Sequence, residues 1–355
     1  MRTHFKSRVL AAVAGATVIV AGSVGVSAQT VEQFYKGKQI SLIVGAGAGG
    51  AYDLVSRTVA RHMGRHIPGQ PGFVVSNMVG ASSLIMTNYL YNAAKKDGTV
   101  MGMGNANIAL EPGLNMLSRR GGKAQFDVGK IKWIGSPLQQ PQVVWLFHTA
   151  PAKTFADLKT TKIILGSLGV GGDNFVVPWL MNQLLGTRFE MVTGYKAQGD
   201  VFVAAERGEV HGNVAILPNL IAAKSDWWRE KKVRVLATAG AKRSPSQPDV
   251  PTAAELASNA ADRAVFEFWS RKYHMAYPLF VGPDVPTDRV AALRAAFDAT
   301  MKDGEFLDDA KRLKLEIEPY RGEEIEKLMV EIQAAPQDLV ARVAQLIKPP
   351  SSGKK

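Results

Sequence analysis

Short apolar runs alternate with helical periodicities along the first part of the chain. Residues 39–44 (QISLIV) are apolar and β-branched and end at a glycine-rich turn, which is typical of a strand. In the next segment, Val55, Val59 and Met63 recur every four residues, as on one buried face of a helix. We therefore expect a βαβαβ unit with a parallel sheet, built from strands over 39–44, 73–75 and 99–103 and helices over 52–66 and 82–94.

The alternation resumes after a loop-rich middle and predicts a second α/β unit. The pattern predicts strands over 132–134, 143–147, 162–165, 189–192, 214–216, 233–237 and 277–281. It predicts helices over 174–185, 200–207, 252–257, 289–301 and 323–347. Pro336 lies inside the last of these and should kink or split it, because proline lacks the N–H that a helix interior needs.

The first 28 residues have the organisation of a secretory signal peptide. Basic residues precede an almost wholly apolar stretch over 9–20, and the small residues at 26–28 form a cleavage signature before Gln29. The apolar stretch is shorter than the roughly 20 residues that span a membrane. We expect cleavage before Gln29 and localisation in a Gram-negative periplasm, because a chain without a lipid anchor needs an outer membrane to retain it.

Composition narrows the class further. The chain has 355 residues, more than the roughly 250–300 at which single cores stop growing, so two domains are expected. It contains no cysteine, which excludes thiolate zinc sites, iron–sulfur clusters and a thiol nucleophile. The formal charge is +12, and removal of the three basic residues of the predicted signal peptide leaves 12 − 3 = +9. These basic residues are scattered among acidic ones without interleaved aromatic residues, so no nucleic-acid partner is expected.

Two glycine-rich turns follow predicted strands and precede predicted helices. The first runs over 45–53 (GAGAGGAYD) and the second over 166–173 (GSLGVGGD). In open α/β sheets the ligand lies beyond the carboxyl ends of the strands, and a helix N-terminus there offers unpaired N–H groups to an anion. The two turns therefore predict a two-sided clamp for a small carboxylate, with Ser167 adding a hydroxyl donor.

An exported oxidoreductase that binds a dinucleotide is the alternative. Gly45, Gly47 and Gly50 form a G-x-G-x-x-G pattern after a strand, but no acidic residue from 54 to 96 could hold the ribose. His62 and His66 share a helix face, yet arginines flank them, which favours a solvated face over metal ligands.

Several short motifs follow one another along the mature chain. They are I-x-L-I-V before Gly49-Gly50-x-x-Asp53 and Arg57; Val79-Gly80-Ala81; Lys96-Asp97-Gly98-Thr99; Gly166-Ser167; Gly194-Tyr195-Lys196; and Lys242-Arg243-Ser244 before Pro248-Asp249-Val250-Pro251-Thr252 and Glu255. Their order and spacing resemble the substrate-binding proteins of tripartite tricarboxylate transporters, also called Bug proteins. The resemblance covers essentially the whole mature chain.

The resemblance implies a two-domain α/β, type II periplasmic-binding-protein fold that closes on a small organic acid and delivers it to large and small membrane subunits. It implies a first domain at 29–135 plus 241–355 and a second at 136–240. We expect a monomer with no enzymatic activity, cofactor, metal or membrane anchor, and a disordered tail at 349–355. A receptor that presents its ligand to a sensor kinase is a second alternative. The ligand contacts implied are Ala48, Gly49, Gly50, Asp53, Ser167, Gly171 and Gly172.

Two further residues bear on the ligand. Asp173 stands where family members commonly have a small or hydroxyl residue, and it would repel a carboxylate unless it turns away as a cap or meets a cation of the ligand. Three ligand classes therefore stay open. They are a di- or tricarboxylate, an aromatic monocarboxylate, and an amino-bearing acid whose positive charge would be met by Asp53 or Asp173. Asn105 could reach the ligand or simply cap a helix. We interpret Asp53 chiefly as a helix N-terminal residue that pairs with Arg57.

Overall fold

The computed structural model describes Met1 and residues 29–114, 123–244 and 246–348. The predicted signal peptide beyond Met1 and the predicted tail at 349–355 lie outside the described residues. Within the described ranges, none of the helices is long and apolar enough to span a membrane.

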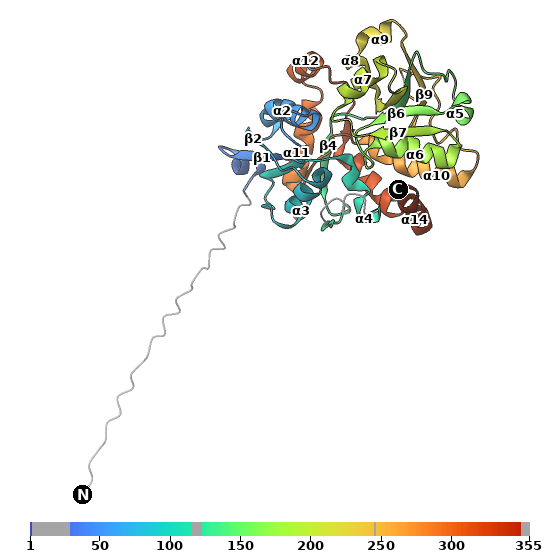
Figure 1. The fold of residues 1–355 in the computed structure, drawn as a ribbon. Coiled ribbons are helices and arrows are strands. Elements are labelled where there is room, and N and C mark those ends of the chain that lie inside the picture. The colour runs from blue at the N-terminus through green and yellow to red at the C-terminus, as the bar shows by residue number, and fades with distance from the viewer. Residues whose placement is uncertain (2–28, 115–122, 245, 349–355) are drawn as a thin grey trace.

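The first of two sheets has six strands in the order β11-β4-β10-β3-β1-β2. Figure 1 labels β1, β2 and β4 of this sheet. β1 pairs in parallel with β2 and β3, so the predicted βαβαβ unit is confirmed. β10 runs antiparallel to both β3 and β4. The strands are β1 (Gln39–Val44), β2 (Gly72–Asn77), β3 (Val100–Met103), β4 (Lys132–Ser136), β10 (Leu279–Val281) and β11 (Tyr320–Arg321).

Helix α2 (Ala51–Met63) packs on this sheet through the face that its sequence predicts. Val55, Val59 and Met63 are at most 1% exposed and join Ile40 and Leu42 of β1 in one core. The other helical elements of this part are α1 (Val31–Tyr35), η1 (Gly64–His66), η2 (Ala81–Ser83), α3 (Leu84–Asn92), η3 (Ala106–Ala109), α4 (Glu111–Leu114), α11 (Thr287–Thr300), α12 (Gly304–Arg312) and α13 (Gly322–Gln333), where η marks a 3-10 turn.

The second sheet has five strands in the order β7-β6-β8-β5-β9. β6 is parallel to β7 and β8, whereas β5 is antiparallel to β8 and β9. The strands are β5 (Gln142–Phe147), β6 (Ile163–Ser167), β7 (Phe189–Thr193), β8 (Gly212–Ile216) and β9 (Val233–Thr238). The helices are α5 (Asp157–Thr160), α6 (Asp173–Leu185), α7 (Gln198–Glu206), α8 (Leu217–Ala223) and α9 (Ser225–Arg229).

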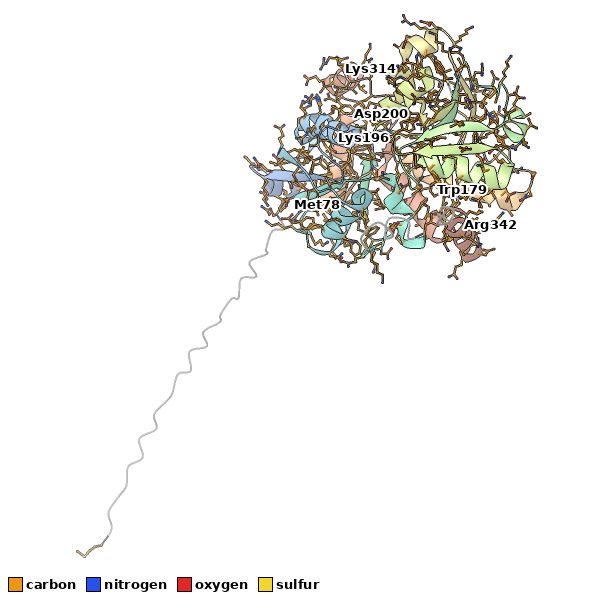
Figure 2. The ribbon with its side chains drawn as sticks, in the orientation of Figure 1. Met78, Trp179, Lys196, Asp200, Lys314 and Arg342 are labelled. Carbon is orange, nitrogen blue, oxygen red and sulfur yellow. The ribbon has the colours of Figure 1, made fainter. Side chains whose placement is uncertain are left out.

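The chain passes between the two sheets more than once. Residues 137–141 join β4 to β5, and the return after β9 runs through α10 (Ala260–Ser270) and the 3-10 turn η5 (Arg271–His274) into β10. The last described helix, α14 (Gln337–Leu346), reaches the second sheet's helix α6, where Trp179 Nε1 donates to Leu346 O at 2.8 Å (Figure 2). The division into domains at 29–135 plus 241–355 and at 136–240 stays a prediction.

The helix expected over 252–257 is wrong. Thr252 N donates to a Glu255 carboxylate oxygen at 2.7 Å, and Glu255 N donates to Thr252 Oγ1 at 3.0 Å, so the segment closes into a turn. The helix begins later, at α10, where Asn259 accepts from Asp262 N and caps it. The expected split at Pro336 is confirmed, because that residue separates α13 from α14.

Candidate functional site

A cavity of about 770 Å³ lies where β6 and β8 of the second sheet end and α6, α7 and α8 begin. One lining residue, Asn105, comes from the turn after β3 of the first sheet, so the cavity is built from both parts of the fold. The lining residues are Asn105, Gln142, Leu168, Asp173, Asn174, Gln198, Gly199, Phe202, Val214, Ala215, Ile216, Asn219, Leu220 and Ala223.

The second glycine turn brings α6 to this cavity. The helix N-cap is Gly172, which has no side chain to cap the first N–H groups. Ser167 is fully buried at the end of β6; its hydroxyl donates to Asn174 Oδ1 at 2.9 Å and accepts from Gly169 N at 3.3 Å. As placed, Ser167 shapes the turn and orients Asn174. Gly171 and Gly172 are half-buried beside it.

Three lining amides have their oxygen atoms already occupied. Asn174 Oδ1 accepts from Ser167, Asn105 Oδ1 accepts from Asn107 N at 2.8 Å, and Gln198 Oε1 accepts from Asn213 Nδ2 at 3.1 Å. Gln198 Nε2 is buried and has no hydrogen-bond partner within the described part of the chain. In these three amides the groups left to meet a ligand are therefore NH₂ donors, which match the acceptor oxygens of a carboxylate.

Helix α7 adds its own N-terminus to the cavity through Gln198 and Gly199. The Asp200 carboxylate accepts from Lys196 N at 3.1 Å and from Ala197 N at 3.0 Å, which fixes the entry into the helix (Figure 2). Sequence reasoning missed Gln198, Gln142 and Asn219, since amide residues follow no spacing rule. The one usable signal was the Gly194-Tyr195-Lys196 motif just before α7.

Asn105 caps η3 through its Oδ1, which confirms one of the two roles that its sequence left open. It also lines the cavity, and its predicted contact with a ligand stays a prediction. Its backbone N–H donates to Ser83 Oγ at 2.9 Å, and that hydroxyl donates to Gly45 O at 3.0 Å. The same hydroxyl thus ties the first glycine turn to Asn105. Ser83 has a φ of 75°, a left-handed conformation that is uncommon for serine and costs strain.

The first glycine turn lies apart from this cavity. Ala48, Gly49 and Gly50 are exposed and are not among its lining residues. Their predicted contact with a ligand stays a prediction.

The Asp53 carboxylate is folded under the first turn. It accepts from Arg57 Nε at 3.0 Å, Gly49 N at 2.9 Å and Asn77 Nδ2 at 3.0 Å. The bond from Arg57, followed by those from Gly49 and Asn77, lowers the pKa of Asp53 to about 2. The predicted pairing of Asp53 with Arg57 is confirmed, and its predicted contact with a ligand stays a prediction.

Asp173 meets a cation of the protein itself. Its Oδ1 accepts from Lys272 Nζ at 2.7 Å and from the Tyr273 hydroxyl at 3.0 Å. Burial lowers the pKa of Lys272, and the Asp173 charge opposes that shift. Burial likewise raises the pKa of Tyr273. Sequence reasoning considered only a cation of the ligand near Asp173 and missed Lys272, which lies 99 residues further along the chain.

The first turn of α2 reaches towards the same region. The Tyr52 hydroxyl donates to Ala276 O at 3.3 Å, and its ring lies 4.7 Å from that of Tyr277. Burial raises the pKa of Tyr52, and the charges of Tyr277 and Asp173 add to the shift.

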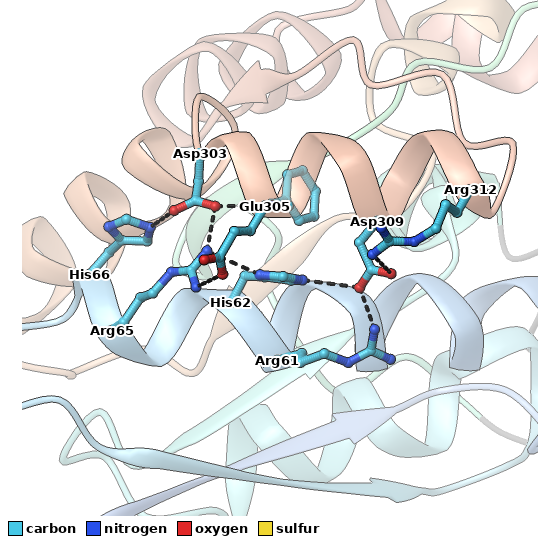
Figure 3. Close-up of polar contacts among 9 residues, drawn as sticks. Arg61, His62, Arg65, His66, Asp303, Glu305, Asp309 and Arg312 are labelled. Atoms are coloured by element: carbon cyan, nitrogen blue, oxygen red, sulfur yellow. Dashed lines mark hydrogen bonds and ion pairs between the residues drawn. The ribbon is translucent and has the colours of Figure 1, made fainter.

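The expected solvated face around His62 and His66 is wrong. The His62 side chain is 8% exposed, and its Nε2 lies 3.0 Å from Asp309 Oδ2, while His66 Nε2 lies 2.9 Å from Asp303 Oδ2 (Figure 3). The sequence pattern could not show that α12, some 240 residues further on, packs its acidic face against α2 and η1.

His62, Asp303 and Glu305 lie close enough together to consider a metal site. Arg65 pairs with both Asp303 and Glu305, so a guanidinium already supplies the positive charge there (Figure 3). The arrangement is an ion-pair network that fastens α12 to α2, on a face where the ligand cavity has no lining residue.

Two α/β sheets with a cavity where strands end and helices begin form the arrangement of a protein that binds a small molecule. The family model described as the tripartite tricarboxylate transporter family receptor matches residues 55–348. The chain belongs to this family. Because the family consists of receptors rather than enzymes, the alternative of an exported oxidoreductase is wrong. A comparison with curated protein sequences gave no match.

Solved structures share the fold. A TctC solute-binding protein from Polaromonas, without ligand, has a TM-score of 0.66 at 20% identity, covering 87% of this chain and 99% of that one. MatC from Rhodopseudomonas palustris with bound malate has a TM-score of 0.57 at 19% identity, covering 88% and 99%. Another R. palustris protein, with adipate, has a TM-score of 0.59 at 20% identity, covering 87% and 98%. The predicted α/β binding-protein fold is therefore confirmed.

Proposed function

We propose that the chain is a periplasmic receptor that binds a small organic acid through a carboxylate in the cavity between β6, α6 and α7. The observation that carries the proposal is the set of amides whose oxygens are occupied and whose NH₂ groups remain for a ligand: Asn105, Asn174 and Gln198. A buried donor that lacks a partner costs roughly 1–3 kcal/mol, and a ligand oxygen would remove that cost at Gln198.

The structural neighbours with malate and adipate support a carboxylate as the ligand class. The predicted signal peptide supports export, and family membership supports delivery to the large and small membrane subunits of a transporter. Closure of the two sheets on the ligand would add contacts from Ala48, Gly49 and Gly50, which are exposed in the present arrangement. Such closure needs only that the ligand bind the closed form more tightly than the open one.

The experiment uses the chain from Gln29, unfolded in guanidinium and refolded so that any co-purified ligand is lost. Malate, adipate, benzoate and an amino acid are titrated by calorimetry, with adipamide as the matched neutral control. We expect at least one acid to bind and adipamide to bind far more weakly. Equal binding of adipate and adipamide, or no binding of any acid, would contradict a carboxylate receptor.

Delivery is tested separately, by uptake of the bound acid into vesicles that contain the co-expressed membrane subunits. We expect uptake to depend on added receptor. Binding without uptake would instead favour presentation of the ligand to a sensor kinase.

A further inference from the structure

We propose that Lys272 is a positioning residue that lets the cavity accept an anion, because its buried ammonium neutralises the Asp173 carboxylate on the cavity wall. The inference rests on the proposed carboxylate-binding function and adds the residue that permits it. Lys272 itself does not line the cavity.

The ammonium is held from three sides. Lys272 Nζ lies 2.7 Å from Asp173 Oδ1 and 2.7 Å from Asn107 Oδ1, and it stands 3.7 Å from the centre of the Trp269 ring. An aromatic face attracts a cation, most strongly where water is excluded. The Lys272 side chain is 1% exposed. The Lys272 ammonium therefore interacts with protein groups and not with solvent.

The carboxylate is the exposed half of the pair. The Asp173 side chain is 21% exposed against 1% for Lys272, so the negative end faces the cavity and the positive end lies behind it. The Tyr273 hydroxyl also donates to Asp173 Oδ1, and Trp269 Nε1 donates to that hydroxyl at 3.0 Å. These bonds fix the carboxylate through its Oδ1, and the residue lines the cavity.

The pair also joins the two parts of the fold. Asp173 begins α6 on the second sheet, Lys272 belongs to η5 just before β10, and Asn107 lies in η3 just after β3 of the first sheet. The neutralised Asp173 therefore sits where elements of both sheets meet.

Electrostatics shows why the cavity needs this lysine. A like charge within about 4–6 Å disfavours an ionised group by about 1–3 pKa units, which corresponds to about tenfold to a thousandfold in binding. Among the described residues that line the cavity, Asp173 carries the charge. Without Lys272, its carboxylate would repel a ligand carboxylate bound beside Asn174. With Lys272 in contact the pair is neutral, and the amide donors decide what binds.

The test compares K272M, D173N, the double variant and wild type, each from Gln29, with malate and adipate titrated at neutral pH. Circular dichroism and thermal unfolding check that each variant is folded. The control is K96M: Lys96 is another largely covered lysine, whose Nζ donates to Leu90 O at 2.9 Å, and it is not among the cavity's lining residues.

We expect K272M to weaken binding about tenfold or more. The double variant should return to within about threefold of wild type, because it removes the uncompensated charge as well. K96M should bind as wild type does. If K272M does not fold, D173N still tests the inference, since it leaves the ammonium in place and should bind the acids more tightly.

Unchanged binding by K272M would overturn the inference. A loss of affinity in K272M that the double variant fails to restore would also overturn it, because Lys272 would then act only through packing. Unchanged binding by D173N would also overturn it. If wild type binds neither acid nor any other carboxylate of the panel, the proposed function fails and the inference falls with it. The wild-type titration therefore separates the two failures.

Discussion

Ser167 Oγ donates to Asn174 Oδ1 at 2.9 Å, and this bond decides that the NH₂ end of Asn174 faces the cavity. Ser167→Ala removes the bond and lets the amide turn. We expect carboxylate affinity to fall about fivefold, since one such hydrogen bond contributes about 1 kcal/mol. Calorimetry measures the loss.

Ser270→Ala is the matched control for that variant. Ser270 is a buried serine whose hydroxyl donates to Glu267 O at 2.9 Å, and it does not line the cavity. An equal loss of affinity in both variants would show that Ser167 acts through general stability rather than through Asn174.

Gln198→Leu should weaken carboxylate binding more than Ser167→Ala. It removes a buried donor outright, and a hydrogen bond to a charged group contributes about 1.5–3 kcal/mol, or roughly tenfold or more in affinity. The variant also leaves Asn213 Nδ2 without its acceptor, so a modest fall in Tm is expected. Gln345→Leu, on the exposed face of α14, controls for the change of residue type. Titration with adipate would contradict the role of Gln198 if both variants bound it equally.

Periodicity in the sequence predicted the elements whose burial repeats regularly. Val55, Val59 and Met63 all face the core because a helix brings every fourth residue to one side. The turn at 252–257 shows the limit of the method. The reciprocal bonds between Thr252 and Glu255 are typical of a helix start, but they close a single turn because the chain then bends into α10. Local pattern carries no information about where tertiary contacts stop a helix.

Some residues of the candidate site could be predicted from the sequence and others could not. Glycine patterns located the two turns. Asp173 and Asn105, which follow strands, line one cavity, and their contact with a ligand stays a prediction. Gln198 follows no motif of its own. In the sequence, nothing distinguishes Lys272 from a surface lysine. The fold buries it by bringing η5 beside α6. Residues that act through contacts distant in sequence cannot be found from spacing along the chain.

Gly45→Ala and Gly47→Ala should differ sharply in stability. A Cβ at Gly45 would lie 2.4 Å from Ser83 Oγ and 2.5 Å from Ser83 Cβ, whereas nothing lies within 4 Å of one at Gly47. Overpacking of this kind typically costs about 1–3 kcal/mol. Because Ser83 also receives the Asn105 N–H, Gly45→Ala should weaken ligand binding as well. Guanidinium unfolding checks the pair, and equal stability of the two variants would contradict the close packing at Gly45.

Acid should weaken the attachment of α12 to η1 through Asp303, which pairs with Arg65 and His66. The Phe306 N–H, followed by Arg65 and His66, lowers the pKa of the Asp303 carboxyl from its usual 3.8 to about 2. A group whose pKa is lower in the folded state stabilises the fold above its unfolded pKa, and this stabilisation is lost as pH falls through the folded value. The contribution of Asp303 is therefore complete above about pH 4 and disappears towards pH 2. We expect wild type to be more stable than Asp303→Asn at pH 5, with a difference in the free energy of unfolding that shrinks as pH falls over this window. Denaturant titrations at a series of pH values measure that difference, and a constant difference between the two proteins would show that the ionised carboxylate is not what fastens the helices.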